Sequence, residues 1–402
     1  MTALAYCVHM EDHPHVSGYP FKCPRGLDLH PAYKELRENH PVARVTLPPG
    51  GPPAWVVTGY HSARYVLVNQ ELFSREQAAE LPGYPPLRDS LLGMDLNRHA
   101  RVRRVAARAF TPRRVEQLRP RIQHTATQML EVTEGQGPPA DLIESVLLPL
   151  PLAVIGDLLG VPTDDRPQFQ AWGDAFLAST KYSQQQAVQA QQAMGAYLAD
   201  LINQRRSSPD DDLLSAVVHD ETGLSDSELV NLAIAILVGG FETTATMAAL
   251  QLYYLLTHPE HLAYVREDLT RLPAAIEELL RTIPLGEGDG LPRIATRDVE
   301  LEGSTIRKGD LVFVSTPSAN FDDEAFAGAD SVDFTRPENP HLGFGHGPHY
   351  CLGANLARAE IHVVLATLLE RLPGLRLGVA PEDLAWKEGL HVRGLKQLPV
   401  EW

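Results

Sequence analysis

The chain has 402 residues, of which 44% are hydrophobic and 21% charged, a composition typical of a globular protein with a sizeable core. Its 35 lysines and arginines against 51 aspartates and glutamates give a formal charge of −16, which argues against non-specific binding to nucleic acid or to an anionic membrane. Cys7, Cys23 and Cys351 are too few for a disulfide framework. The first residues, MTALAYCVHMEDHPH, lack the basic and continuous apolar segments of a secretory signal. We therefore expect a cytoplasmic monomer.

The N-terminal part of the chain predicts short helices and strands. PAYKELREN, which begins at Pro31, has a helical pattern, VARVTL and AWVVT have the β-branched content of two strands, and HSARYVLVN returns to a helical pattern. Residues 72 to 95 show little periodicity and predict a long irregular loop, a kind of loop that is often functional. From Leu96 to Arg206, helical stretches follow one another with breaks at Pro and Gly residues.

A long apolar helix is predicted next. Ser225 and Glu228 have the spacing of a capping box, and about 30 helical residues follow, enough to cross a whole domain at roughly 1.5 Å per residue. Polar residues interrupt this segment, so it predicts a buried helix of a soluble protein. Its polar cluster, Glu242-Thr243-Thr244, needs a partner or water, because an isolated buried carboxylate costs several kcal/mol. A packed helix whose threonines bond to the preceding turn is the alternative.

The C-terminal part contains a second strand region and a second notable helix. Helical patterns end at EELLRT, RIATRDVELEGSTIRKGDLVFVS alternates like antiparallel strands, and residues 317 to 350 form a coil before the helical pattern of CLGANLARAEIHVVLATLLERL. We therefore predict a mainly α fold with small β-sheets, organised as a single domain over residues 1–402.

Cys351 lies where the glycine-rich stretch GFGHGPHY meets this last helix. Unpaired amide groups and the positive helix end predict a stabilised thiolate there, and one thiolate on a glycine-rich loop suits a single axial metal ligand. The alternative is a buried cysteine that acts as a small hydrophobic residue.

Residues 344–353, FGHGPHYCLG, resemble the haem-binding signature of the cytochrome P450 family. Further stretches match in the family's order, namely HARVR from His99, GGFET from Gly239, ELLR from Glu278, and Arg336 ahead of NPH. Short sequence segments such as FTPRRVE and GLPRIAT are similar to segments of soluble bacterial, actinomycete-like members of the family. The resemblance covers essentially the whole chain and implies the P450 fold, a triangular helical prism enclosing haem b (iron protoporphyrin IX).

The resemblance also implies roles for individual residues. It makes Cys351 the ligand of the haem iron and Glu242 with Thr243 the acid–alcohol pair that delivers protons during oxygen activation. Two other sets of residues are implied by similarity. The cofactor-binding set is His99, Arg103, Arg293, His349, Phe344, Gly345 and Gly353, and the structural network is Glu278, Arg281 and Arg336. A solvated basic face, loop ion pairs and a surface i, i+3 pair are the alternatives for these charged residues.

Electrons must come from another protein, because the chain has no flavin or nicotinamide fingerprint and no iron–sulfur cysteine set. The segment from Arg98 to Arg121 contains nine arginines and only one acidic residue, Glu116, so its net charge is positive although that of the whole protein is negative. By resemblance this region docks an acidic ferredoxin, supplied by an NAD(P)H-dependent ferredoxin reductase. An arginine face that serves only solubility is the alternative.

The predicted function is that of a haem-thiolate monooxygenase which hydroxylates or epoxidises a mid-sized natural product in secondary metabolism. Alternatives are a P450 that couples or cyclises its substrate without oxygen insertion, for example a cyclic dipeptide, and a non-catalytic haem-binding recruiter or sensor. Four residues could orient a polar substrate or lie in loops and at the surface: Arg75, Tyr84, Gln185 and Glu287.

Overall fold

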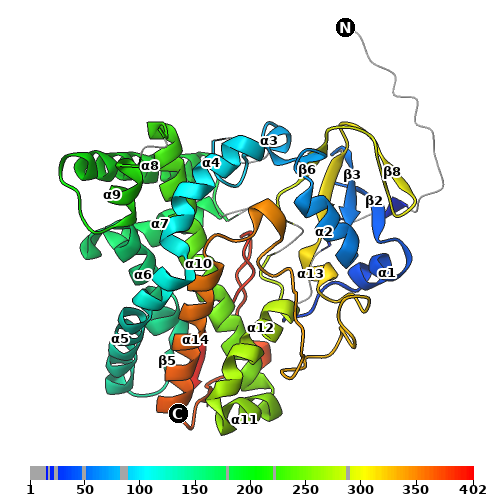
Figure 1. Ribbon diagram of the computed structural model, residues 1–402. Coiled ribbons are helices and arrows are strands. Elements are labelled where there is room, and N and C mark those ends of the chain that lie inside the picture. The colour runs from blue at the N-terminus through cyan, green and yellow to red at the C-terminus, as the bar shows by residue number, and fades with distance from the viewer. Residues whose placement is uncertain are drawn as a thin grey trace.

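The computed structural model describes residues 15–16, 19–21, 26–47, 51–81, 89–177, 181–220, 223–286 and 290–402. Cys7, Cys23, Tyr84 and Glu287 lie outside the described residues. Helices dominate: α5 to α9 gather on one side of the molecule, strands such as β2, β3, β6 and β8 lie on the other, and α10 and α14 pass between them, while β5 lies beside α5 and α14 (Figure 1). The helices are α1 Pro31–Asn39, α2 Tyr60–Val68, α3 Arg75–Ala78, α4 Leu96–Ala107, α5 Pro112–Gln136, α6 Pro149–Leu159, α7 Arg166–Phe176, α8 Gln184–Ser207, α9 Leu213–Val218, α10 Asp226–Thr257, α11 Pro259–Glu267, α12 Leu272–Thr282, α13 Thr316–Ala319 and α14 Ala354–Arg371.

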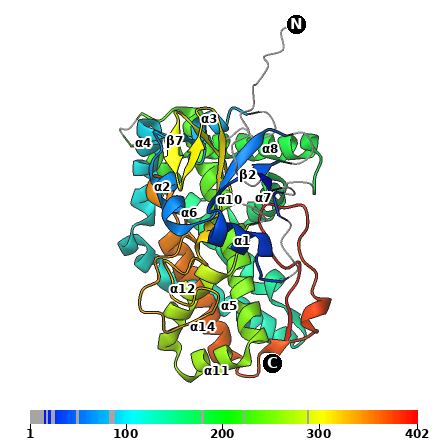
Figure 2. The same cartoon turned by 90° about the vertical axis from the view of Figure 1, so that its right-hand side faces the viewer.

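Three small sheets accompany the helices. The largest has the order β1-β2-β3-β9-β6-β4, and the others are β10-β11-β5 and the hairpin β7-β8. In the view of Figure 2 the strands β2 and β7 lie above the helices α11, α12 and α14. The strands are β1 His15–Val16, β2 Val42–Thr46, β3 Pro53–Val57, β4 Phe73–Ser74, β5 Ala140–Asp141, β6 Arg293–Ala295, β7 Val299–Leu301, β8 Ser304–Ile306, β9 Leu311–Val314, β10 Arg376–Leu377 and β11 Pro399–Glu401.

The structure corrects two sequence predictions. The two strand regions are not separate, because β3 pairs in parallel with β9, with Val56 opposite Phe313. Residues 72 to 95 are not an unbroken loop either, since they include β4 and α3, and the helix α4 follows directly at Leu96. β10, β11 and β5 form a further sheet that the sequence pattern did not indicate.

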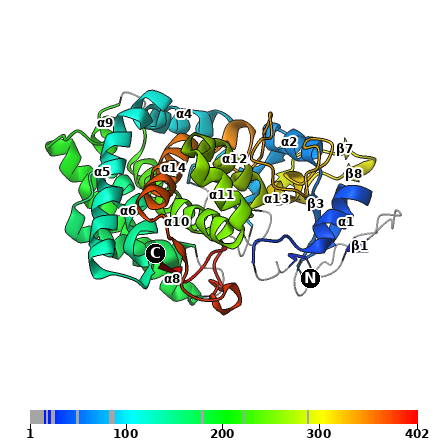
Figure 3. The same ribbon diagram turned by 90° about the horizontal axis from the view of Figure 1, so that it is seen from below.

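Helix α10 is the central helix of the core. Ser225 and Glu228 form the predicted capping box, and the 32-residue helix packs against α6, α8 and α14. Figure 3 shows it crossing the molecule beside α11 and α14. By length and composition α10 could span a membrane, but 78% of its most apolar window is buried inside the protein. The predicted burial of this helix is confirmed.

Candidate haem site

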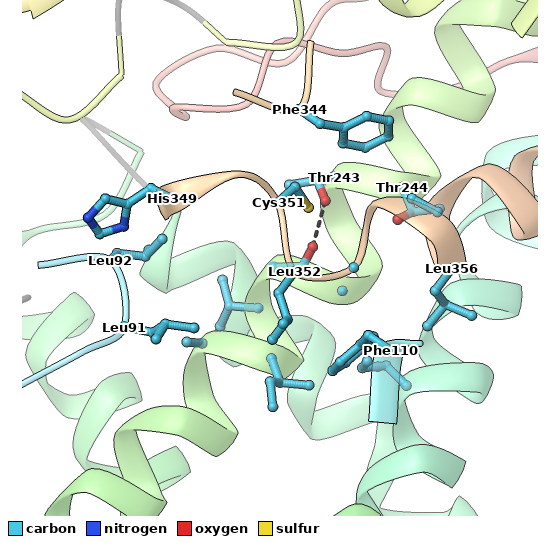
Figure 4. Close-up of a pocket in the computed structure, with 18 of the residues that line it drawn as sticks. Leu91, Leu92, Phe110, Thr243, Thr244, Phe344, His349, Cys351, Leu352 and Leu356 are labelled. Atoms are coloured by element: carbon cyan, nitrogen blue, oxygen red, sulfur yellow. Dashed lines mark hydrogen bonds between the residues drawn. The ribbon is translucent and has the colours of Figure 1, made fainter. Parts of the chain in front are cut away.

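A cavity of about 520 Å³ lies between the middle of α10 and the loop that precedes α14. Figure 4 shows the contributions of Thr243 and Thr244 from α10 and of the loop from Phe344 through Cys351. Apolar side chains form most of the lining. Among them are Leu91, Leu92, Phe110, Ile155, Phe176, Ile234, Val238, Leu285, Leu291, Leu352 and Leu356.

Cys351 is held at the cavity by a tight backbone turn. Its amide nitrogen donates to the Phe344 carbonyl at 2.9 Å, and the Gly345 amide donates to Leu342 at 2.8 Å. Gly345 has a φ of +73°, in the left-handed region that favours glycine. A side chain at Gly353 would meet no protein atom within 4 Å, although Gly353 lines the cavity. The loop therefore presents an exposed cysteine and an open backbone surface to whatever fills the cavity.

The thiol of Cys351 does not favour ionisation by itself. Burial raises its pKa, while a backbone hydrogen bond at Gly353 and the charges of Arg103 and Arg358 oppose this rise. The predicted amide contribution is present at Gly353 and favours the thiolate, but burial outweighs it. A coordinating metal cation supplies the missing stabilisation, because it deprotonates a thiol that binds it.

Polar donors without partners gather at one edge of the cavity: His99 and His349 line it, and Arg293 does not line it but interacts electrostatically with His349. His99 is 2% exposed and Arg293 is 3% exposed, yet His99 Nε2 and Arg293 Nη2 have no hydrogen-bond partner among the described residues. His349 Nε2 is also unpaired, and its ring lies 4.2 Å from that of His99 between centroids. Buried donors need acceptors, so this edge fits an anionic group that enters from the cavity.

Both histidines are neutral at pH 7. Burial, aided by the charges of Arg103 and Arg75, lowers the pKa of His99 to about 4, and burial lowers that of His349 to about 3. They therefore act as N–H donors, and the positive charge at this edge comes from arginines. Arg103 also lines the cavity and donates from Nη2 to the carbonyl of Tyr350.

Thr243 and Glu242 take different positions on α10. Thr243 lines the cavity, and its hydroxyl donates to the Gly239 carbonyl at 2.7 Å, the dashed bond in Figure 4. Glu242 is 1% exposed, does not line the cavity and forms an ion pair with Lys387. Burial raises its pKa, which Lys387 partly offsets.

The two glycines before this pair also differ. A side chain at Gly239 would meet nothing within 4 Å, whereas one at Gly240 would lie 2.7 Å from Ile155. Gly239 thus leaves room in the cavity, and Gly240 permits close packing of α10 against α6.

The predicted contact among Glu278, Arg281 and Arg336 is present. Arg281 donates to both carboxylate oxygens of Glu278 at 2.9 and 2.6 Å, and Arg336 Nε lies 3.2 Å from Glu278 Oε2. Arg281 also donates to the carbonyls of Asn320, Ala329 and Ser331. This network attaches α12 to the coil that leads to Cys351.

A second network beside it was missed in the sequence. Arg358 donates to both oxygens of Glu277 at 2.6 and 2.8 Å and lies 4.5 Å from the centroid of the Phe344 ring. His341 Nδ1 accepts from the Gly343 amide, so its Nε2 carries the proton and donates to Glu277. Burial would raise the pKa of Glu277, but the bonds from His341 and Arg358 hold it at about 2.

The arginine-rich segment has more acidic neighbours than the sequence suggests, because acids from distant segments fold against it. Five of its arginines form ion pairs with such acids or with Glu116, and Arg103 faces the cavity. Arg104, Arg113 and Arg114 are exposed and form no ion pair with any residue the structure describes. The five pairs are Arg98 with Glu76 and Asp89, Arg101 with Glu228, Arg108 with Asp220, Arg119 with Glu116, and Arg121 with Asp157.

Two of the four polar residues suggested for the substrate can be placed. Arg75 lines the cavity, which excludes a purely surface role. Gln185 is exposed near the beginning of α8 and does not line the cavity. Gln191 and Asn231, which the sequence analysis did not single out, do line it.

A cavity with one exposed cysteine on a glycine turn and unpaired buried donors at its edge defines a haem-thiolate protein. The family profile described as Cytochrome P450 matches residues 16–373. The chain is 46% identical over 96% of its length to nocardicin C N-oxygenase of Nocardia uniformis subsp. tsuyamanensis, of which 98% is covered.

Solved structures show the same fold. LnmA, a P450 hydroxylase from the leinamycin pathway of Streptomyces atroolivaceus S-140, matches with a TM-score of 0.89 and 44% identity over 96% of this chain and 99% of that one. Cytochrome P450mel 107F1, with biaryl coupling reactivity, matches with a TM-score of 0.92 and 38% identity over 97% and 100%. The chain belongs to the cytochrome P450 family, is a haem-dependent monooxygenase by class, and has the predicted P450 fold.

Proposed function

We propose that this protein oxidises a mid-sized natural product of secondary metabolism by hydroxylation or epoxidation. The observation that carries the proposal is that Thr243 and Cys351, from segments far apart in the chain, line one cavity of about 520 Å³. Cys351, with His99, Arg103, Arg293 and His349, would hold haem, and the bound haem would supply the chemistry of dioxygen activation.

Within this proposal, Thr243 holds the proton that reaches the cavity. Its hydroxyl lies in the lining and bonds to the Gly239 carbonyl, from which it can turn toward a ligand. Glu242 acts behind it as the buried acid, and Lys387 sets the charge of that acid. Thr243 is thus the residue that contacts the reacting group, and Glu242 supplies it with protons.

The lining favours a substrate with an apolar body and a few hydrogen-bonding groups. The side-chain amides of Gln191 from α8 and Asn231 from α10 line the cavity and form no hydrogen bond with another residue in the described part of the chain. In an otherwise apolar wall, these amides are available to donate to and accept from substrate hydroxyl or amide groups.

Oxidative coupling or cyclisation without oxygen insertion is the second candidate. Its support is the likeness to the P450 with biaryl coupling reactivity. A non-catalytic recruiter or sensor is the third, and it would bind ligands without turnover.

The electrons are proposed to come from an acidic ferredoxin, which is itself reduced by an NAD(P)H-dependent ferredoxin reductase. The docking surface, which we call the arginine patch, consists of Arg104, Arg113 and Arg114, which are exposed and have no acidic partner among the described residues. Arg104 adjoins Arg103, whose guanidinium binds the residue before Cys351. We also propose that residues 1–402 act as one cytoplasmic domain, as a monomer.

The test combines a ligand screen with turnover. Purified ferric protein is titrated with natural products while the Soret band is followed for loss of axial water. Each ligand that binds is then incubated with the enzyme, ferredoxin, reductase, NADPH and O2, and the masses of the products are measured by mass spectrometry. A gain of one oxygen atom supports the proposal. Loss of two hydrogens without oxygen establishes coupling or cyclisation instead, and binding without turnover of any ligand contradicts both.

A further inference from the structure

Arg75 is an arginine that faces the haem cavity without a satisfactory partner. It is the first residue of α3, and the one hydrogen bond of its side chain to a described residue is a long contact of 3.4 Å from Nη1 to the Leu92 carbonyl. The side chain is half-buried, and its Nε is buried with no acceptor among the described residues. A buried guanidinium donor without an acceptor costs free energy, which a ligand carboxylate would recover.

The surroundings of Arg75 identify the part of the cavity it faces. Its charge is close enough to lower the pKa of both His99 and His349, and it also acts on Arg293. Arg75 also lines the same cavity as His99 and His349, so it shares the edge at which these two histidines have unpaired ring nitrogens. His349 belongs to this edge and is two residues before Cys351, so the edge lies on the cysteine side of the cavity.

Asp95 is the acid of this edge, and it does not neutralise Arg75. Asp95 Oδ2 accepts from Ser74 Oγ at 2.6 Å and from the Glu76 amide at 3.0 Å. Its other oxygen has no hydrogen-bond partner and lies 3.9 Å from His349 Nε2. Arg75 forms no ion pair within 4.0 Å with Asp95 or any other described residue, although burial and Asp95 together leave the pKa of Arg75 at about 10.

The charges at this edge are unbalanced in the protein alone. Among its arginines and carboxylates, the positive guanidinium groups of Arg75, Arg103 and Arg293 stand against the one carboxylate of Asp95. Two positive charges are left over, which equals the negative charge of the two haem carboxylates. Without Arg75, the loaded site would carry one uncompensated negative charge in a partly buried place, which is costly.

We propose that Arg75 is a further haem-binding residue, which donates its guanidinium hydrogen bonds to a haem propionate and completes the charge balance of the buried edge. This inference concerns the cofactor and is independent of the substrate and of the reaction proposed above.

The test measures haem affinity and midpoint potential in substrate-free holoenzyme. In R75Q we expect haem transfer to apomyoglobin to be about ten- to hundredfold faster, the effect of one hydrogen bond to a charged group. The midpoint potential becomes more negative, because a positive charge near the iron favours the reduced state. The matched control is R376Q, which removes one positive charge from an exposed position on β10, outside the cavity lining; its haem-transfer rate and potential stay at wild-type values.

Two further variants separate charge balance from folding effects. R75Q/D95N restores the balance of charges, so its potential moves back toward the wild-type value. R75K keeps the positive charge but lacks the paired N–H donors of the guanidinium group, so its midpoint potential stays near the wild-type value while haem transfer is severalfold faster. R75K therefore also tests the proposal if R75Q does not fold.

Wild-type haem transfer and potential in R75Q, or wild-type haem transfer in R75K, would overturn the proposal. A carboxylate of the substrate is the other source of the same chemistry. If R75Q retained the wild-type rate and potential and lost only the Soret response to a carboxylate-bearing ligand, Arg75 would belong to the substrate site.

Discussion

Glu242 and Lys387 form a buried ion pair that joins the centre of α10 to the C-terminal loop, across 145 residues of sequence. The lysine side chain is 18% exposed and the glutamate side chain 1%. The backbone of Lys387 is fixed by a hydrogen bond from its amide to the carbonyl of Gly394 at 2.7 Å. The position of the C-terminal loop therefore controls the charge of the acid next to Thr243.

Removing Lys387 should destabilise the protein in a pH-dependent way. Burial raises the pKa of Glu242, and K387M takes away the charge that opposes this rise. A carboxyl group with a raised folded-state pKa is destabilising when ionised, so the cost grows as the pH rises above its unfolded value near 4.5. We expect K387M to lose about 3 kcal/mol of unfolding free energy at pH 8, in the range for a broken buried pair, and less at pH 5.

Urea titrations at both pH values measure this loss. The double variant K387M/E242Q is the control and should regain most of the stability. An equal loss at pH 5 and pH 8 would show that the effect of Lys387 is not transmitted through Glu242.

Thr243→Ala should uncouple the reaction. The variant lacks the hydroxyl that lines the cavity, so proton delivery fails while substrate binding, followed at the Soret band, stays near wild type. We expect most reducing equivalents to appear as hydrogen peroxide, and T243S to keep most of the coupling. Product formed per NADPH is the measurement, and unchanged coupling in T243A would exclude a proton-relay role for Thr243.

Arg281→Ala should yield a protein that does not retain haem. The change leaves Glu278, which is 1% exposed, without its bidentate partner, and three coil carbonyls lose their donor. The expected loss is about 3–5 kcal/mol. R307A is the matched control, because the pair of Arg307 with Asp298 is exposed and contributes about 1 kcal/mol or less. Absorbance of bound haem per protein reports the result, and a normally loaded, stable R281A would refute the network.

The arginine patch should govern reduction by the ferredoxin. R113Q/R114Q removes two exposed positive charges that no described acid pairs, so long-range attraction to an acidic partner weakens. We expect the reduction rate at low salt to fall about tenfold or more and to depend less steeply on ionic strength. Stopped-flow reduction is the measurement. R376Q, which removes an exposed arginine paired with Glu401, is the control, and equal rates in both variants would place docking elsewhere.

The sequence was sufficient where the information is local. The capping box at Ser225 and the spacing of Glu278 and Arg281 concern neighbours in the chain, and the structure has them as predicted. The coil predicted for residues 317 to 350 is present only in part, because the short helix α13 and a 3-10 helix over Gly347–His349 interrupt it. What the sequence did not reveal are contacts between distant segments. The parallel pairing of β3 with β9 and the partner of Glu242 depend on how the whole chain closes.

Charge was the least predictable property. The nine arginines from Arg98 to Arg121 do not form a uniformly free face, because acids such as Asp89, Glu228 and Asp157 come from other segments. Arg75 shows the opposite case, since a residue in an apparently irregular loop faces the cofactor cavity.

Every step proposed for this protein depends on Cys351 as the ligand of the haem iron, and the absorbance spectrum of the ferrous carbon monoxide complex tests this claim most directly. The strongly red-shifted Soret band of thiolate ligation is the predicted result, and it should be lost in C351H while haem content is monitored separately. A Soret band at the unshifted position of imidazole ligation in the wild-type protein would contradict the assignment of Cys351.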